Sequence, residues 1–216
     1  MVLDEVSFSI RSGERVALLG KVGSGKSTAA RLLFGLYEPT SGAVMVDGID
    51  IRQIEPFDVK RNMSLVLQDS WLFSGSVREN ILAGSTSFDD TDMLEASEIA
   101  GVSEFLSDHP EGYDLKVSEG GGGLSGGQKQ SISIARGLVG SPSVVVMDEP
   151  TSMMDMASEA RLVKRMQSFL ENRTFIVITH RSAMLQLVDR VIVFDKGRIV
   201  LDGPKELLNK NKQKPE

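Results

Sequence analysis

The feature that most constrains the fold is the segment GKVGSGKS at residues 20–27, directly after the short apolar stretch 15–19. It fits the pattern G-x-x-x-x-G-K-[ST], in which a glycine-rich loop joins a strand to a helix and surrounds phosphate groups. Standing alone, the same glycines are also compatible with an ordinary tight turn. We therefore expect a strand over 15–19, a phosphate-binding loop and a helix over 26–36, which together indicate an α/β fold.

Two further motifs follow in a fixed order. Residues 124–128 read LSGGQ, and the apolar strand 144–147 runs into the acidic pair Asp148-Glu149. By average residue usage, a phosphate-loop pattern arises by accident in roughly one chain in a hundred of this length, and LSGGQ is rarer by more than a further order of magnitude. The three motifs together resemble the ATP-binding cassette (ABC) family, the ATPase domains of membrane transporters. The resemblance covers essentially the whole chain.

Composition excludes several other classes of protein. The 216 residues are 41% apolar and 25% charged, as in ordinary globular domains. A net charge of −6 disfavours a nucleic-acid-binding surface, so we expect no nucleic-acid partner. The absence of cysteine excludes disulfides and thiolate metal sites. We find no apolar run long enough to cross a bilayer, and the first five residues do not resemble a signal peptide.

The pattern along the chain predicts one domain, 1–216, with a helical subdomain at about 69–140 that interrupts a core made of 1–68 and 141–216. The resemblance implies a P-loop NTPase (RecA-like) core with an ABC-type antiparallel β subdomain. Alternation of apolar and polar residues over 2–10 predicts a half-buried strand. We also expect a frayed tail over 209–216. The other expected strands are 43–46, 63–67, 144–147, 174–179, 190–194 and 198–201, and the other expected helices include 77–82, 92–100, 102–108 and 127–139.

The glycine-rich loop supplies the chemistry for binding a nucleotide. Its glycines let backbone N–H groups converge on phosphate oxygens, and the positive end of the following helix dipole points to the same place. Lys26 is expected to reach the β- and γ-phosphates, and the Ser27 hydroxyl to bind Mg²⁺. The resemblance assigns Thr28 to the α-phosphate. The expected ATP-binding residues are Gly20, Val22, Gly23, Ser24, Gly25, Lys26, Ser27 and Thr28.

The expected hydrolytic residues lie at strand ends, where an α/β sheet places its ligands. By resemblance, Asp148 holds Mg²⁺ through water, and Glu149 is the general base that orients the attacking water. A solvated loop is the alternative for such a pair of carboxylates. His180 resembles the family's switch histidine, although a lone histidine at a strand end is more often structural. Gln68 stands where the family has its Q-loop, which senses the γ-phosphate and Mg²⁺.

The signature residues pose a geometric problem, because they belong to the inserted helical region and not to the phosphate loop. The resemblance implies that they close on the ATP held by a second copy, so that two domains enclose two nucleotides. Ser152 and Asp155 match the family's D-loop, where Met153 and Met154 are larger than the usual residues. The in-trans signature comprises Leu124, Ser125, Gly126, Gly127 and Gln128. Because both halves of the sandwich are complete, we expect a homodimer.

Within the family, the segments 72–81 and 112–122 resemble those of exporters. Their residues are similar to those of the bacterial type I protein-secretion ATPases that export haemolysins and large adhesins. This implies a transmembrane-domain partner and a place at the cytoplasmic face of the bacterial inner membrane. Trp71 and Phe73 then either face that partner or pack in the subdomain core. His109, which precedes a proline, is expected on a surface loop.

Exporters of this kind carry a membrane domain and an adenine-stacking aromatic residue upstream of the first strand, and neither lies in this sequence. We interpret the chain as an excised domain or a fragmentary gene product, with base recognition weakened by about 1 kcal/mol. Export of a lipid or small molecule is an alternative function. A DNA-repair or translation cassette would carry coiled-coil insertions or tandem cassettes. A module that holds ATP without turnover is opposed by the intact Lys26, Glu149 and His180.

Overall fold

A computed structural model describes residues 2–83, 85 and 87–208, so the expected tail at 209–216 lies outside the described residues. Its centre is a six-stranded sheet in the order β10-β9-β1-β8-β7-β4. Neighbouring strands run parallel, except that β10 is antiparallel to β9. The strands are β1 (Arg15–Gly20), β4 (Met63–Val66), β7 (Val144–Asp148), β8 (Thr174–Ile178), β9 (Arg190–Asp195) and β10 (Arg198–Pro204). The carboxyl ends of β1, β4, β7 and β8 therefore share one edge of the sheet.

The inner part of the sheet is buried on both faces because β1, β7, β8 and β9 are apolar at consecutive positions. The residues of the edge strand β10 alternate between exposed and partly buried. On one face, Val16 and Leu18 of β1 pack against Ala29 and Ala30 of helix α1 (Lys26–Leu33). On the other face, Ala17 belongs to a larger core together with residues of α6 (Gly126–Leu138) and α7 (Met156–Phe169). Helices on both faces of a parallel sheet are what the alternation of strand and helix along the sequence predicts.

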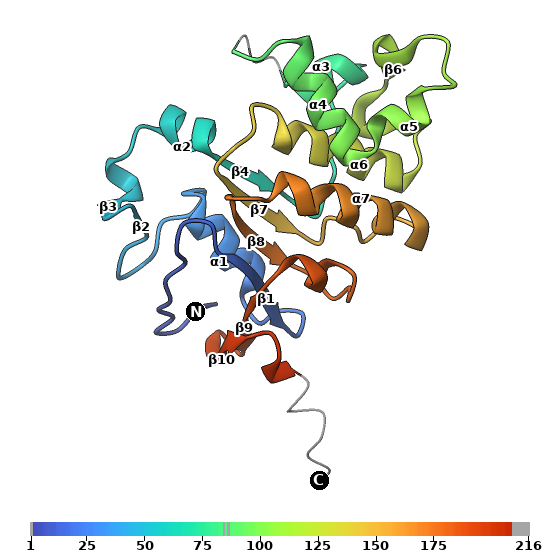
Figure 1. The fold of residues 1–216 in the computed structure, drawn as a ribbon. Helices are drawn as coiled ribbons and strands as arrows, with labels where there is room; N and C mark the ends of the chain where they lie inside the picture. The colour runs from blue at the N-terminus through green and yellow to red at the C-terminus, as the bar shows by residue number, and fades with distance from the viewer. Residues whose placement is uncertain (1, 84, 86, 209–216) are drawn as a thin grey trace.

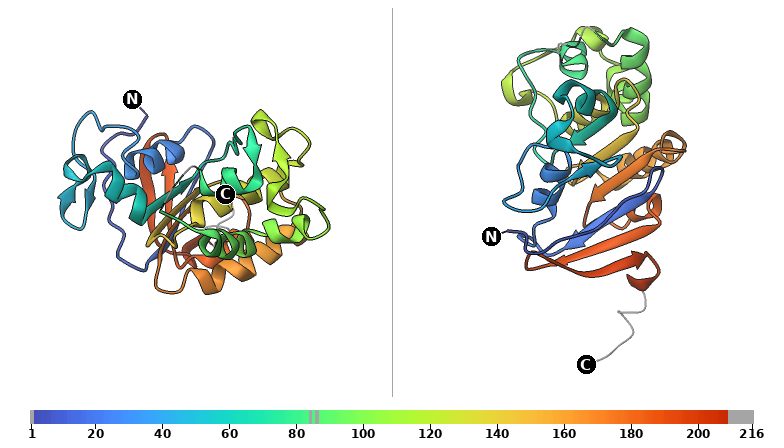
Figure 2. Two further views of the ribbon diagram at one scale, coloured as in Figure 1. Left: turned by 90° about the horizontal axis from the view of Figure 1, so that it is seen from above. Right: turned by 90° about the vertical axis from the view of Figure 1, so that its left-hand side faces the viewer.

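A group of helices lies at one end of the sheet, opposite the end formed by β9 and β10 (Figures 1 and 2). Helix α6 packs against this group and also against β4 of the sheet. The close contact depends on Gly137, because a Cβ there would lie 2.5 Å from Cγ2 of Val66. The elements of this end are α3 (Val77–Leu82), α4 (Asp90–Ala100), α5 (Val102–Leu106) and the strand pair β5 (Gly75–Ser76) and β6 (Lys116–Val117).

The strand expected over 2–10 is wrong. This segment is not part of any sheet, although Asp4 N–H donates a hydrogen bond to Gly197 O at 2.9 Å. The alternation itself is present, since Val6, Phe8 and Ile10 are partly buried against the sheet core and the residues between them are exposed. Periodicity reports which side chains are buried, whereas a strand also needs a neighbour with free backbone groups.

Several boundaries also differ from expectation. The strand expected over 43–46 is shorter in the structure: β2 (Met45–Val46) forms an antiparallel hairpin with β3 (Ile49–Asp50). Helix α4 begins two residues before the expected Asp92, because Asp89 accepts hydrogen bonds from the first turn. The remaining elements are α2 (Pro56–Asn62) and the 3₁₀ turns η1 (Ile51–Gln53), η2 (Gly112–Asp114), η3 (Glu119–Gly121) and η4 (Met184–Leu187). No helix in the described part of the chain has the length and apolarity that a membrane span requires.

Candidate functional site

The loop after β1 has a backbone path that only glycine permits at two points. Gly20 has φ 142°, and a Cβ on it would lie 2.2 Å from the Phe194 carbonyl oxygen. Gly25 has φ 105°, and a Cβ on it would lie 2.4 Å from Cδ2 of Leu3. No side chain caps α1 at Gly25, so the N–H groups of its first turn are directed at the loop. This arrangement is a general anion-binding site.

Two buried polar groups in the loop point to a phosphate ligand. Lys26 is 6% exposed, and its Nζ donates to the carbonyl oxygens of Gly20 at 2.7 Å and Lys21 at 2.9 Å. Burial lowers the pKa of this ammonium group, and the nearby carboxylates of Glu149 and Asp148 partly oppose that shift. The Ser24 hydroxyl is buried with no hydrogen-bond partner among the described residues. Both groups fit a site built to receive phosphate oxygens.

The acidic pair lies at the end of β7, beside the end of β8. Asp148 is 3% exposed and stands opposite Ile178 in the β7–β8 register. Glu149 has a left-handed backbone, φ 49°, and its N–H donates to Ile178 O at 2.8 Å. Its carboxylate is 3.6 Å from Nε2 of the half-exposed His180. Burial raises the pKa of Glu149, and the imidazole of His180 opposes this shift. The structure thus brings Asp148, Glu149 and His180 together, as the sequence predicts.

The other expected Mg²⁺ ligands supply only neutral oxygens. Ser27 and Thr28 lie in the first turn of α1 and are partly buried, whereas Gln68 is exposed just after β4. The described residues contain no group of three or more histidines, aspartates or glutamates that could hold a metal. A hydroxyl, an amide and one carboxylate acting through water form a donor set that suits Mg²⁺ sharing its shell with phosphates.

The signature residues form the first turn of a different helix. Ser125 caps α6, because its hydroxyl accepts from Gln128 N–H at 3.2 Å and the Gln128 side chain accepts from Ser125 N–H at 2.8 Å. A Cβ on Gly126 would lie 2.9 Å from Sδ of Met153, so this turn is packed against the D-loop. Among the described residues, no hydrogen bond joins 124–128 to the phosphate loop.

Sequence reasoning missed a glutamine that ties α6 to the acidic strand end. Gln130 is 2% exposed; its Nε2 donates to Ser152 Oγ at 2.7 Å and to Glu149 O at 3.3 Å, and its Oε1 accepts from Met153 N–H at 2.9 Å. A polar residue on the apolar side of α6, beside Ile132 and Ile134, is a signal that could have marked it.

Arg136 was also missed, and it holds the aromatic loop before α3. Its guanidinium donates to Trp71 O at 3.0 Å and to Asn80 O at 2.7 Å, and it lies 5.2 Å from the centre of the Phe73 ring. The backbone of this loop is fixed further by Asn80, which accepts from Phe73 N–H at 2.8 Å. Trp71 and Phe73 remain 57% and 56% exposed, which opposes the alternative that they pack in the subdomain core.

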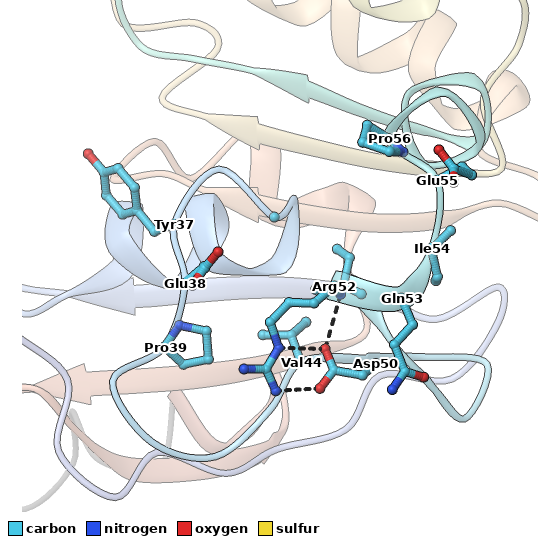
Figure 3. Close-up of a pocket in the computed structure, with 12 residues that line it drawn as sticks. Tyr37, Glu38, Pro39, Val44, Asp50, Arg52, Gln53, Ile54, Glu55 and Pro56 are labelled. Carbon is cyan, nitrogen blue, oxygen red and sulfur yellow. Dashed lines mark hydrogen bonds and ion pairs between the residues drawn. The ribbon is translucent and has the colours of Figure 1, made fainter.

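A surface hollow of about 300 Å³ lies away from all of these residues, between the segment after α1 and the β3–α2 connection (Figure 3). Its floor carries Arg52, whose guanidinium donates to Asp50 at 3.0 and 2.6 Å. These hydrogen bonds lower the pKa of the Asp50 carboxyl to about 2. The positive charge is therefore already neutralised, and the hollow has none of the glycine-rich backbone that a phosphate site needs.

A family model described as "ABC transporter" matches residues 3–152. The chain belongs to this family. Its α/β core, phosphate loop and inserted helices are those of an ABC ATPase domain, as the motifs predict.

Individual relatives sharpen the comparison. The exotoxin translocation ATP-binding protein PaxB of Pasteurella aerogenes is 40% identical over 212 residues, which is 98% of this chain and 30% of PaxB. The toxin RTX-I translocation ATP-binding protein of Actinobacillus pleuropneumoniae is 41% identical, over 96% of this chain and 30% of its own length. The chain thus spans about 30% of the length of these curated relatives.

A solved structure agrees with the sequence comparison. The structure of a bacterial Atm1-family ABC exporter with ATP bound superposes with a TM-score of 0.91 at 36% identity. The match covers 98% of this chain and 37% of the exporter chain.

Proposed function

We propose that this chain is the ATP-hydrolysing domain of an ABC exporter of the type I protein-secretion class. The single observation that carries the proposal is the meeting of Lys26, Glu149 and His180 at one edge of the sheet, beside a glycine-rich loop. The named relatives support the finer assignment, since they are toxin translocation ATP-binding proteins. A binding module without turnover would not need the partly buried carboxylate of Glu149 and its histidine neighbour.

The residues divide the chemistry between binding and hydrolysis. The loop N–H groups, Lys26, Ser27 and Thr28 would hold the phosphates of ATP, and Ser27, Gln68 and Asp148 are the candidates for holding Mg²⁺, the last through water. Bound Mg²⁺ would neutralise charge on the β- and γ-phosphates. Glu149 accepts a proton from, and orients, the attacking water, and its raised pKa makes it a better base than an exposed glutamate. His180 would contact the γ-phosphate and position Glu149.

We further propose that the working unit is a head-to-tail homodimer. Ser125 and its glycines are exposed or partly exposed at the start of α6, where the helix dipole favours a phosphate. They are not joined to their own phosphate loop, which favours an ATP held by a second copy. Ser152 and Asp155 would line the same junction from the D-loop. In this arrangement the core (1–68 and 141–216) carries the phosphate loop, and the helical subdomain (about 69–140) carries the signature.

The exposed pair Trp71 and Phe73 is the proposed contact with a transmembrane domain, at the cytoplasmic face of the bacterial inner membrane. Two large aromatics more than half exposed on a loop held by Arg136 and Asn80 form a rigid apolar surface. The length of the relatives, about three times that of this chain, leaves room for such a domain.

Phosphate release by the purified chain in ATP and Mg²⁺ tests the proposal. The Glu149→Gln variant keeps the shape of the side chain and loses the base, so we expect turnover to fall at least about 100-fold. Binding of ATP should persist. Glu95→Gln, an exposed change on α4, is the matched control and should keep parental turnover. Parental turnover in the Glu149→Gln variant would exclude Glu149 as the base, and an inactive parent would exclude the proposed function.

A further inference from the structure

A buried carboxylate behind the site has no role in the chemistry described so far. Glu159 of α7 has a side chain only 7% exposed. Its two oxygens serve different partners: Oε1 accepts from the Thr151 hydroxyl at 2.6 Å, and Oε2 accepts from Nη1 of Arg181 at 3.2 Å. Burying a carboxylate is costly unless it is paired and hydrogen-bonded, and both conditions are met here.

Arg181 extends this link to the D-loop backbone. Its Nη2 donates to the Ser152 carbonyl oxygen at 3.0 Å, while Nη1 holds Glu159. The backbone N–H of Arg181 donates to the Thr179 hydroxyl at 3.0 Å, which fixes the turn that also carries His180. A guanidinium presents its donors in a rigid fork, so one side chain joins two segments with little freedom between them.

The D-loop segment itself is tied at several points. Ser152 N–H donates to Glu149 O at 3.3 Å, and Met154 N–H donates to Thr151 O at 3.0 Å. Asp155 caps α7 by accepting from Ser158 N–H at 2.8 Å. These hydrogen bonds restrain the D-loop, so we expect a displacement of Arg181 to move the whole segment.

We propose that Arg181 and Glu159 are positioning residues that make the His180 turn and the D-loop move as one unit. The inference rests on the proposed function, because only in a head-to-tail dimer do Ser152 and Asp155 face the ATP of the partner. His180 responds to the ATP of its own chain, and the fork of Arg181 passes that response to the D-loop. The link is a physical basis for cooperativity between the two ATP sites, because the Arg181–Ser152 hydrogen bond of each chain joins the turn at its own ATP to the D-loop at the partner's ATP.

The test compares turnover with binding in two variants of Arg181 and one control. Arg181→Met keeps the apolar stem and removes the fork. We expect kcat to fall about tenfold or more, because small misplacements of catalytic groups cost rate. The Hill coefficient for ATP should fall to about 1. Binding is measured by titrating the fluorescent nucleotide N-methylanthraniloyl-ATP into protein that is dilute enough to stay monomeric. The Kd of the variant should stay within about twofold of the Kd of the parent.

A second variant, Arg181→Lys, separates the role of Arg181 in positioning the D-loop from its contribution to the stability of the fold. A lysine keeps the charge beside Glu159 but lacks the fork that spans both acceptors. We expect its thermal unfolding midpoint to approach that of the parent, while its Hill coefficient stays reduced. The matched control is Arg15→Met. Arg15 is equally exposed, 33% against 32%, and its ion pair with Asp189 involves no residue of the site. This control should keep the parental kcat and Hill coefficient.

Three results would each overturn this inference and leave the proposed function intact. They are a parental Hill coefficient and kcat in Arg181→Met, an equal loss in Arg15→Met, or an active parent whose hydrolysis is not cooperative in ATP. A parent that does not hydrolyse ATP would instead remove the proposed function on which the inference rests, so the two failures are distinguishable.

Discussion

Glu149 occupies a backbone conformation that few side chains adopt. Its φ of 49° lies in the left-handed region, and conformations of this kind cost of order 1 kcal/mol. The hydrogen bond from its N–H to Ile178 O and the contact of its carbonyl with Gln130 hold it there. Glu149 thus combines a strained backbone with a partly buried carboxylate. Strain of this kind is typical of active-site residues, whose exact position serves function at a cost to the stability of the fold.

The raised pKa of Glu149 predicts the pH dependence of turnover. A general base must be ionised, and burial makes ionisation harder, so kcat should fall with decreasing pH along a limb centred above the ordinary glutamate value of 4.5. Steady-state rates across the pH range measure this limb directly. A limb centred at or below pH 4.5 would contradict the assignment.

The same shift predicts the stability of Glu149→Gln. Because the folded-state pKa is raised, the folded chain binds this proton more tightly than the unfolded chain does. Glu149 therefore destabilises the fold at pH values above the unfolded pKa of about 4.5, and that penalty disappears below it. We expect the variant to unfold at a higher temperature than the parent at pH 7.5, and by a smaller margin at pH 5. Equal margins at both pH values would show that ionisation is not the cause.

The site residues found from sequence and those missed differ in a physical respect. Lys26, Glu149 and His180 would act on the ligand, so chemistry restricts their type and their spacing along the chain. Gln130 and Arg181 act on other parts of the protein, and their partners lie 22 and 29 residues away in the sequence. Such contacts depend on how the elements pack, which no local pattern encodes.

Among the elements, the sequence predicts the inner strands of the sheet closely because they are apolar on both faces and follow turn residues. The segment 2–10 was mistaken for a strand because its burial alternates in the same way. Its backbone has no ladder partner among the described residues, and a periodic pattern cannot reveal whether a neighbour exists.

The packing of α6 on β4 predicts that Gly137→Ala destabilises the fold. Alanine is favoured over glycine in a helix by about 1 kcal/mol, but its Cβ would meet Val66 Cγ2 at 2.5 Å. Overpacking of this kind costs about 1–3 kcal/mol, so we expect a net loss that urea unfolding can measure. Ser133→Ala, a partly exposed change on the same helix, should not lower stability.

A double-variant cycle checks the cause. Val66→Ala removes the methyl group that the new Cβ would meet, so the two changes together should cost less than their sum, by about 0.5 kcal/mol or more. Additive losses would show that the Val66 methyl group is not the cause of the destabilisation, and would point to Ser64 Oγ, which lies 2.8 Å from the same Cβ position.

The separation of the signature from the phosphate loop concerns the molecule as a whole. If each ATP is enclosed by two chains, Lys26→Ala and Ser125→Arg should each be inactive alone, because every site in such a homodimer lacks one half. A mixed dimer rebuilds one complete site from the intact loop of one chain and the intact signature of the other. With equal amounts, half of the dimers are mixed and each carries one complete site, so phosphate release should recover to at most roughly a quarter of the parental rate. Coupling between the two sites would lower the recovered rate further.

Analytical ultracentrifugation of the mixture with ATP provides the control, since it establishes that mixed dimers form. No recovery in mixed dimers that are shown to bind ATP would count against the assignment of Ser125 to the ATP of the partner chain. Independence of the recovered rate from the mixing ratio would contradict the dimer as well.

Helix α6 has a further mechanical consequence. Its 13 residues form one uninterrupted helix about 20 Å long that follows the cap residue Ser125. Gln130 donates a hydrogen bond to Ser152, and Arg136, nearer the C-terminal end, donates one to the carbonyl oxygen of Trp71. Because α6 also packs against α3, α4, α5 and β4, we expect it to tilt together with the elements of this end. A tilt of about 10° around Gln130 would swing the two ends in opposite directions by roughly 1–2 Å, from the 1.5 Å rise per residue. We therefore expect a displacement of the loop that carries Trp71 and Phe73 to reach Ser125 through Arg136 and α6.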